Sequence, residues 1–214
     1  MPPDRSMPTR IAGIEVPQDD VSGASWAAVQ RRLPAYLLAH SIRTYCWGAA
    51  IAATEGWSFD RQVLWSASLW HDVGLSRLSR NTMCFEVEGA EIARAFLERQ
   101  GLAAEAAERV AIAIILHMRP DVTLEDGIES VLLDRATGLD VRGAGFVAAD
   151  LIRDDVAREY PRGAFDRHFL AAIRREASAR PTCQSARLLD EVDLAGWMTR
   201  SPWVHGAGQA GTRS

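Results

Sequence analysis

Apolar residues recur every three or four positions along most of the chain, and regular alternation of apolar and polar residues is scarce. This spacing favours amphipathic helices over strands. Asp60 is a suitable N-cap for one of them, and Gly101 a suitable end for another. The pattern predicts helices at residues 24–32, 34–53, 60–72, 86–100, 103–118, 126–137, 141–158 and 164–179. The sequence therefore predicts an all-α protein built as a single-domain helical bundle.

The two ends of the chain depart from this pattern. Residues 1–20 contain four prolines and are expected to form a loose N-terminal segment. Residues 21–180 are expected to form the helical domain, with 181–205 as a C-terminal extension packed on it. Residues 206–214 are small and polar, which predicts a disordered tail.

Composition limits the classes of partner. The chain has 214 residues, of which 48% are hydrophobic and 24% charged, as in an ordinary globular domain. Its net charge of −4 argues against broad binding to nucleic acid or to an anionic membrane. No apolar run is long enough to span a bilayer, and the first ten residues lack the apolar core of a secretory signal. We expect a small-molecule substrate, no nucleic acid, no membrane, and a possible homo-oligomer.

Cysteine and lysine usage adds two further expectations. Cys46, Cys84 and Cys183 form neither a CxxC motif nor an even-numbered framework, which favours free thiols in a reducing cytoplasm and predicts a cytoplasmic protein. All 24 basic residues are arginine, so chemistry through a lysine Schiff base is excluded.

The strongest chemical signal is an imidazole beside a carboxylate in an apolar run. His71 and Asp72 stand where a predicted helix meets Gly74. Helical spacing also turns His40 and His117 toward the interior, the former with Arg43 one turn away. Any one of these histidines alone is more often a structural residue. Three of them beside a buried carboxylate predict a site for a divalent metal ion, because buried charges must be paired or bind metal.

Four segments resemble a known family. They are residues 38–45 (LAHSIRTY), 69–75 (LWHDVGL), 83–90 (MCFEVEGA) and 137–143 (TGLDVRG). In this order they resemble the HD-domain superfamily of metal-dependent hydrolases, an all-α family with ligands in the order H…HD…D. The resemblance is closer to its cyanamide hydratase-like branch.

The resemblance implies a ligand set and a metal. The four implied ligands are His40, His71, Asp72 and Asp140. Asp150, in an Ala-Asp pair, and Asp134 are alternatives for the last position, the other reading being a solvated carboxylate on a helix face. The expected cofactor is one divalent ion, with zinc favoured and iron, manganese, cobalt or nickel as alternatives.

The resemblance also implies a reaction. A metal ion lowers the pKa of its water toward neutrality. In a hydratase, that water adds to a nitrile-type C≡N carbon and converts cyanamide to urea. The first alternative is an HD phosphohydrolase acting on a nucleotide or another small phosphate ester. The second is a non-catalytic metal-stabilised helical module, although a bundle of this size needs no metal to fold.

Two further residues are candidates for the chemistry. Glu86 lies in the resembling segment and is predicted to act as an acid/base group or to anchor the water. The competing interpretation is an acidic residue favoured by the helix dipole. His117 is predicted to orient water or support the metal ligands, with a core role as the alternative.

Substrate contacts are predicted for Arg43, Arg77, Arg80 and Trp47. The arginines suit phosphate, but Arg43 could instead hold a ligand carboxylate, and Arg77 and Arg80 could lie in a solvated loop. Trp47 could form the wall of a small apolar pocket or belong to the core.

Overall fold

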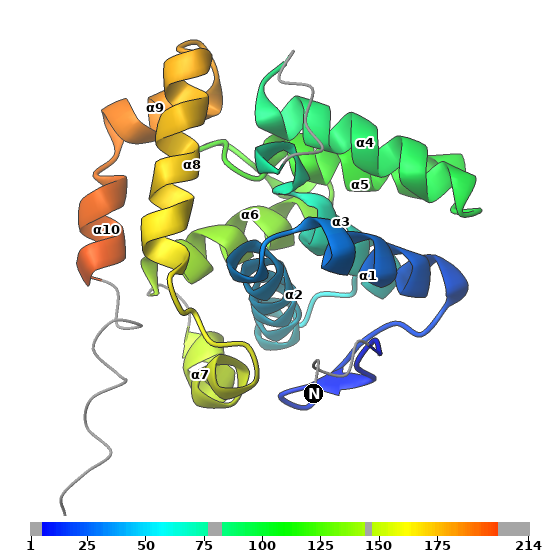
Figure 1. Cartoon of the computed structure of the whole chain (residues 1–214). Coiled ribbons are helices and arrows are strands. Elements are labelled where there is room, and N and C mark those ends of the chain that lie inside the picture. The colour runs from blue at the N-terminus through cyan, green and yellow to red at the C-terminus, as the bar shows by residue number, and fades with distance from the viewer. Residues whose placement is uncertain (1–5, 77–82, 144–146, 201–214) are drawn as a thin grey trace, which may run out of the picture.

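A computed structural model describes residues 6–76, 83–143 and 147–200 of the chain (Figure 1). Almost all of this part is helical, as predicted. The α-helices are α1 (Asp20–Arg32), α2 (Ala35–Glu55), α3 (Arg61–Trp70), α4 (Phe85–Arg99), α5 (Ala104–Leu116), α6 (Ile128–Arg142), α7 (Val147–Glu159), α8 (Phe165–Ala179), α9 (Gln184–Glu191) and α10 (Leu194–Arg200). Two 3-10 turns, η1 (Val73–Leu75) and η2 (Leu124–Asp126), complete the helical elements of the described residues.

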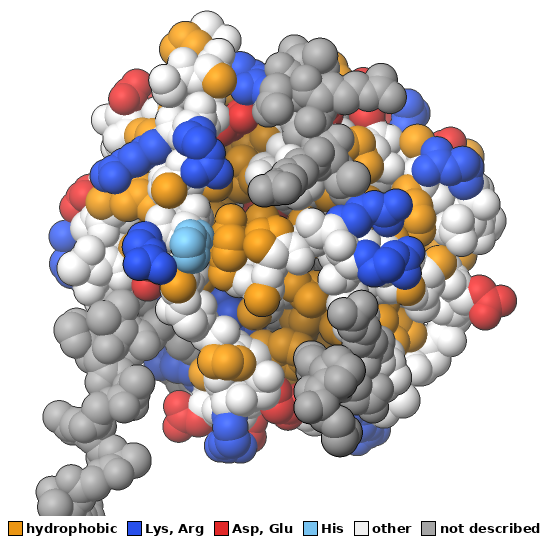
Figure 2. All heavy atoms as spheres, viewed as in Figure 1, with side chains coloured by type: hydrophobic (Ala, Val, Ile, Leu, Met, Phe, Trp, Pro, Cys, Tyr) orange, Lys and Arg blue, Asp and Glu red, His pale blue; other side chains and the backbone are white. Residues whose placement is uncertain are grey.

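The long helix α2 lies at the centre and packs against α3, α6, α7 and α8. Helices α4 and α5 lie side by side on one flank, and α8, α9 and α10 lie on the opposite flank (Figure 1). Trp47, Trp65 and Trp70 are fully buried between these layers. On the face drawn in Figure 2, apolar side chains gather near the centre and charged side chains lie further out.

Local signals explain several helix ends. The Asp60 carboxylate accepts hydrogen bonds from the backbone N–H groups of Gln62 and Val63, so its predicted capping role is confirmed. Gly101 has φ +94° just beyond α4, which confirms the predicted end of that helix. These ends fix the directions in which α3 and α4 leave the core.

The boundary between the two predicted helices at 126–137 and 141–158 was wrong. Helix α6 runs without interruption to Arg142, past Gly138, and ends at Gly143, where φ is +72°. A glycine inside a helix costs only about 1 kcal/mol, whereas the left-handed end conformation strongly favours glycine. Asp140 therefore lies inside a helix.

The N-terminal segment is more ordered than expected. Residues Arg10–Ile11 (β1) and Ile14–Glu15 (β2) form a short antiparallel ribbon, and the Ile11 side chain is fully buried. The predicted extension at 181–205 contains α9 and α10. The predicted tail at 206–214 lies outside the described residues.

The prediction of free thiols was wrong for two cysteines. Cys84 and Cys183 form a disulfide with a Cα–Cα distance of 5.5 Å, although 99 residues separate them in the sequence. It joins the start of α4 to the start of α9. Cys46 is free and buried. None of the described helices is both long and apolar enough to cross a membrane.

Candidate metal centre

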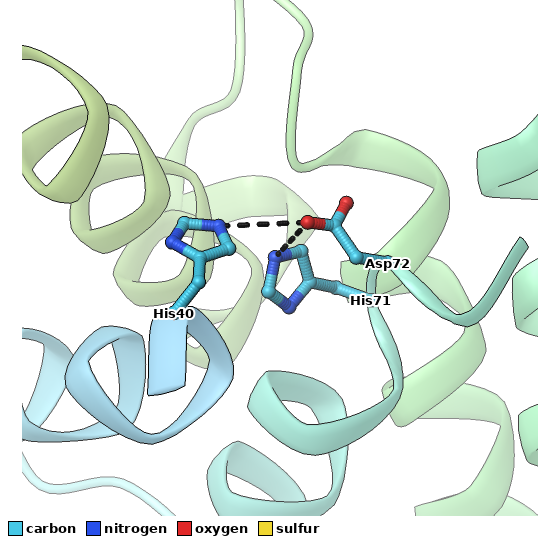
Figure 3. Close-up of side chains that lie close together, drawn as sticks. All are labelled: His40, His71 and Asp72. Carbon is cyan, nitrogen blue, oxygen red and sulfur yellow. Dashed lines mark ion pairs between the residues drawn. The ribbon is translucent and has the colours of Figure 1, made fainter. Parts of the chain in front are cut away.

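Two helices bring three metal-ligating side chains together. His40 comes from α2, while His71 ends α3 and Asp72 precedes η1. Ligand atoms of the three residues all lie within 4.8 Å of one another (Figure 3). Asp72 Oδ2 lies 3.6 Å from His40 Nε2 and 3.3 Å from His71 Nε2, and all three side chains are buried. The predicted convergence of His40, His71 and Asp72 is what the structure shows.

A third imidazole faces the same carboxylate. His117 is the C-cap of α5, and its Nε2 lies 3.9 Å from Asp72 Oδ1. Its ring centroid is 5.0 Å from that of His71, and the side chain is buried. Asp72 is thus surrounded by the Nε2 atoms of three histidines.

Each histidine uses its other nitrogen to contact an acceptor. His71 Nδ1 lies 2.8 Å from the Ser68 carbonyl, and His117 Nδ1 lies 2.5 Å from the Ile114 carbonyl. His40 Nδ1 lies 2.7 Å from Asp140 Oδ2. A carbonyl or carboxylate oxygen only accepts, so Nδ1 carries a proton in each ring, and Nε2 is the nitrogen that has the lone pair in the neutral form. This arrangement is typical of histidines that bind metal.

The arrangement leaves polar atoms that a cation would satisfy. His71 Nε2 and Asp72 Oδ2 are buried and make no hydrogen bond within the described part of the chain. Such atoms are costly unless they are paired or bind an ion. The donor set, imidazole nitrogens with one carboxylate, suits first-row divalent metals. The residues therefore fit a divalent metal ion.

The protonation states of the cluster also suit a cation. Burial would raise the pKa of Asp72, but His71, and then His40 and His117, outweigh it and lower that pKa to about 2. Burial, reinforced by His71, lowers the pKa of His117 to about 4. At neutral pH Asp72 is an anion and His117 a neutral imidazole, the forms in which both residues ligate metals.

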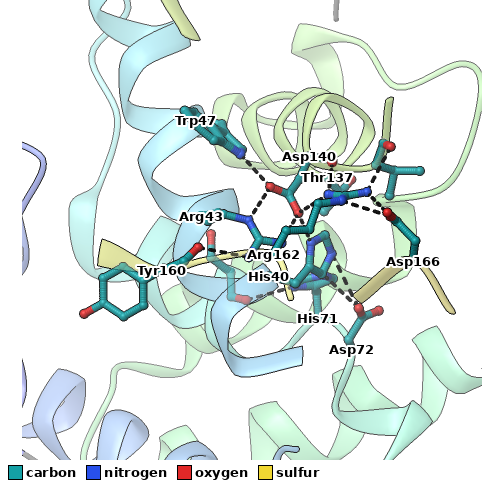
Figure 4. Close-up of polar contacts among 12 residues, drawn as sticks. His40, Arg43, Trp47, His71, Asp72, Thr137, Asp140, Tyr160, Arg162 and Asp166 are labelled. Carbon is teal, nitrogen blue, oxygen red and sulfur yellow. Dashed lines mark hydrogen bonds and ion pairs between the residues drawn. The ribbon is translucent and has the colours of Figure 1, made fainter. Parts of the chain in front are cut away.

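Asp140 lies behind His40 and outside this cluster (Figure 4). Arg43 donates to both of its carboxylate oxygens, from Nε to Oδ1 at 2.8 Å and from Nη2 to Oδ2 at 2.7 Å. Trp47 Nε1 donates to Oδ1 at 2.8 Å. With the contact to His40 Nδ1, each oxygen has at least two partners, so the Asp140 carboxylate orients His40 from the side away from Asp72.

A cavity of about 450 Å³ opens onto the cluster. His40, His71, Asp72 and His117 all line it. Helices α9 and α10 line another part of its wall, including Gln184 and Trp197. The C-terminal extension, to which the sequence assigned no role, thus forms part of the cavity that contains the candidate ligands.

Comparison with known proteins gives the family. The family model described as HD domain matches residues 37–194, well over half of the chain. The protein belongs to the HD domain family. The matched range contains all four cluster residues, and members of this family are generally metal-dependent hydrolases that bind divalent metals. No curated protein matches the chain.

Two residues that were predicted to contact substrate lie outside the cavity of this HD domain. Arg43 and Trp47 are buried against Asp140 and do not line the cavity. Arg43 holds the carboxylate of Asp140, and the alternative that it holds a ligand carboxylate stays a prediction. For Trp47, the interpretation as a core residue is confirmed. Arg77 and Arg80 lie outside the described residues.

The other acidic residues that the sequence analysis singled out lie on different helices. Glu86 is buried, and burial raises its pKa, but it does not line the cavity. The acid/base or water-anchoring role of Glu86 stays a prediction. Asp150 lies on α7, and Asp134 on α6 lines the cavity.

Arg162 is a functional residue that sequence reasoning missed. It lies in the connection between α7 and α8, and its Nη1 donates to the Asp140 carbonyl at 2.5 Å and contacts Asp140 Oδ2 at 3.4 Å. The side chain also lies over the Phe165 ring. An arginine in a connecting segment has no periodic signal, so only the fold reveals that it braces Asp140.

Proposed function

We propose that the protein is a metal-dependent hydratase or hydrolase whose single divalent ion is held by Asp72 and the Nε2 atoms of three histidines. The observation that carries this assignment is the Nδ1 contact of each ring, which turns Nε2 toward Asp72. His117 takes the fourth position in this proposal, because both Asp140 oxygens already have partners. Zinc remains the favoured metal, with iron, manganese, cobalt and nickel as alternatives.

The ion would supply a water molecule of lowered pKa and polarise the atom under attack. The side chains of the protein orient the ligands and the substrate. Asp140, held by Arg43 and braced by Arg162, keeps His40 in one orientation. The cavity wall orients the substrate and limits the access of bulk water to the reacting atoms.

The preferred substrate class is a small molecule with a C≡N group, such as cyanamide. Two side chains beside the imidazoles in the cavity, Phe169 and Thr137, are neutral. The Phe169 ring centroid lies 5.7 Å from that of His40, and Thr137 Oγ1 donates to the His117 carbonyl at 3.2 Å. Neutral walls suit an uncharged substrate, to which water adds to give urea or an amide.

The second candidate is hydrolysis of a phosphate ester, which the cationic side of the cavity favours. Arg119 and Arg142 line it and form no ion pair with a carboxylate among the described residues, whereas Arg187 pairs with Glu191 at 2.6 Å. Arginine is well suited to bind phosphate. The volume of about 450 Å³ would also admit a nucleotide-sized molecule. A purely structural ion would need no cavity of this kind.

The test is a paired assay of the metal-loaded protein. Urea release from cyanamide and phosphate release from nucleoside monophosphates are measured for wild type, His71→Ala and His168→Ala, the last an exposed histidine on α8. We expect urea without phosphate, abolished in His71→Ala and retained in His168→Ala. Phosphate without urea would select the second candidate. Absence of both, with unfolding of the His71→Ala variant, would contradict an enzyme and support a structural ion.

A further inference from the structure

We propose that Asp134 is the proton donor of this site. The inference rests on the proposed function but not on the choice between its two substrate classes. Asp134 lies on α6, one turn before Thr137 and Gly138 and two turns before Val141, and all four line the cavity. The face of α6 that carries Asp134 is therefore the face that meets the substrate.

Among the acidic residues that line the cavity, Asp134 alone has a free carboxyl group. Asp72 faces the three imidazoles. Glu191 is paired with Arg187 at 2.6 Å. The described residues give the Asp134 carboxyl neither a hydrogen bond nor an ion pair.

The other proton-bearing groups of the cavity cannot give up a proton. The Nδ1 protons of the three histidines are donated to protein acceptors. Guanidinium groups do not deprotonate in proteins. The Thr137 hydroxyl is directed at the carbonyls of His117 and Asp134, at 3.2 Å and 2.9 Å. Asp134 is thus the acid that remains.

The charge environment of Asp134 agrees with this role. Burial raises its pKa to about 7, against the lowering influence of Arg142 and Arg135 on the same helix. The charged groups that line the cavity from other elements are Asp72, Arg119 and the ion pair of Arg187 with Glu191. A carboxyl group with a pKa near the working pH is well suited to general acid catalysis.

The step balances for either substrate class. With a C≡N substrate, the water oxygen bonds to carbon, and a π electron pair of the nitrile becomes an N–H bond with the Asp134 proton. The proton that the water loses returns to the Asp134 carboxylate, and the resulting isourea tautomerises to urea. With a phosphate ester, the water oxygen bonds to phosphorus and the bond to the leaving oxygen breaks. The leaving oxygen then takes the Asp134 proton, and the proton that the water loses returns to the Asp134 carboxylate.

The first test compares pH–rate profiles of the metal-loaded wild type, Asp134→Asn and a matched control, Asp154→Asn, an exposed carboxylate on α7. The probes are cyanamide and a nucleoside monophosphate. We expect kcat to fall 10²–10⁴-fold in Asp134→Asn, with loss of the alkaline limb near pH 7 and with metal content and KM nearly unchanged. Asp154→Asn should match wild type.

The second test needs no substrate. A folded-state pKa of about 7, above the 3.8 of an unperturbed aspartate, means that the folded protein retains a proton that the unfolded chain releases between these pH values. The free energy of unfolding of wild type should therefore fall relative to that of Asp134→Asn as pH rises from 4 to 7. Urea unfolding at several pH values measures this difference.

Each outcome decides a separate claim. Wild-type turnover with an unaltered Asp134→Asn profile would overturn the role of Asp134 and leave the proposed function intact. A stability difference that is constant from pH 4 to 7 would also overturn it, because an ionised carboxylate has no proton to give. Lack of wild-type turnover on both probes would overturn the proposed function and this role together.

Discussion

At the scale of single residues, the orientation of His40 depends on one buried carboxylate. Asp140 is fully buried and accepts hydrogen bonds from Arg43, Trp47 and His40. Burial would raise the pKa of Asp140, but Arg43, and then His40, hold it well below its usual value. The residue is therefore a permanent anion that fixes the tautomer and direction of His40, and we propose that it does so without contacting the ion itself.

This assignment predicts a graded loss of metal in Asp140→Asn. The variant keeps an acceptor near His40 but loses the charge that faces Arg43, so we expect metal affinity to fall about 10–100-fold. Metal affinity should fall far more in Asp72→Asn, which removes the charge of a ligand. It should be unchanged in Asp154→Asn. Chelator competition measures all three, with circular dichroism confirming that each variant is folded. Equal losses in Asp140→Asn and Asp72→Asn would instead make Asp140 a direct ligand.

The sequence predicted the residues of the cluster better than their roles. Helical spacing was sufficient to turn His40, His71 and His117 inward, because each lies on an apolar face. It could not tell whether Asp140 would contact a metal or an imidazole, since both arrangements need a buried carboxylate. That distinction depends on Arg43 and Arg162, which approach Asp140 from other elements.

At the scale of elements, the close packing of η1 against the start of α4 sets the position of Asp72. Gly74 lies in η1, and a Cβ there would meet the Phe85 carbonyl oxygen at 2.0 Å and its carbon at 2.7 Å. Both are backbone atoms and cannot move aside as a flexible side chain could. The close approach of η1 to the first turn of α4 therefore requires glycine.

We accordingly expect Gly74→Ala to lower the free energy of unfolding by roughly 1–3 kcal/mol, the cost of overpacking. Metal affinity should fall as well, because Asp72 would shift with η1. The matched control is Gly23→Ala in α1, where a Cβ would meet nothing within 4 Å. That variant should be neutral or gain up to about 1 kcal/mol from helix propensity. Thermal and urea unfolding compare the two, and similar values for both would refute the packing argument.

A second link between elements is the disulfide that joins the starts of α4 and α9. It closes a loop of 99 residues, and Gln184, next to Cys183, lines the cavity. Reduction should lower the free energy of unfolding by about 2–4 kcal/mol. Urea midpoints with and without dithiothreitol measure this, and Cys84→Ser/Cys183→Ser should not respond to the reductant. Three titratable thiols in the unreduced, unfolded protein would show that the bond does not form.

Helices were predicted well where the signal was local. The apolar faces and caps of α2 to α5 lie within a few neighbouring residues, so spacing alone located them. The prediction placed a break between residues 137 and 141, although α6 continues to Arg142 and ends at Gly143. The pairing of Cys84 with Cys183 and the placement of α9 depend on contacts between distant segments, for which one sequence carries no signal.

At the scale of the whole molecule, the fold collects its candidate ligands from separate helices and places them at one end of a cavity. Helix α2 supplies His40, α3 supplies His71 with Asp72 after it, and α5 ends at His117. Helices α9 and α10 add the outer wall. The helical bundle was predictable because its core is apolar throughout, whereas the cavity depends on how the last two helices pack.

The most direct measurement of the central claim is a crystal structure of the metal-loaded protein, with anomalous diffraction at the absorption edge of the bound metal. We predict one ion per chain, about 2.0–2.2 Å from the Nε2 atoms of His40, His71 and His117 and from an oxygen of Asp72, with Asp140 still bound to Arg43. An ion held by Asp140 in place of His117, or no anomalous peak among the three imidazoles, would contradict it.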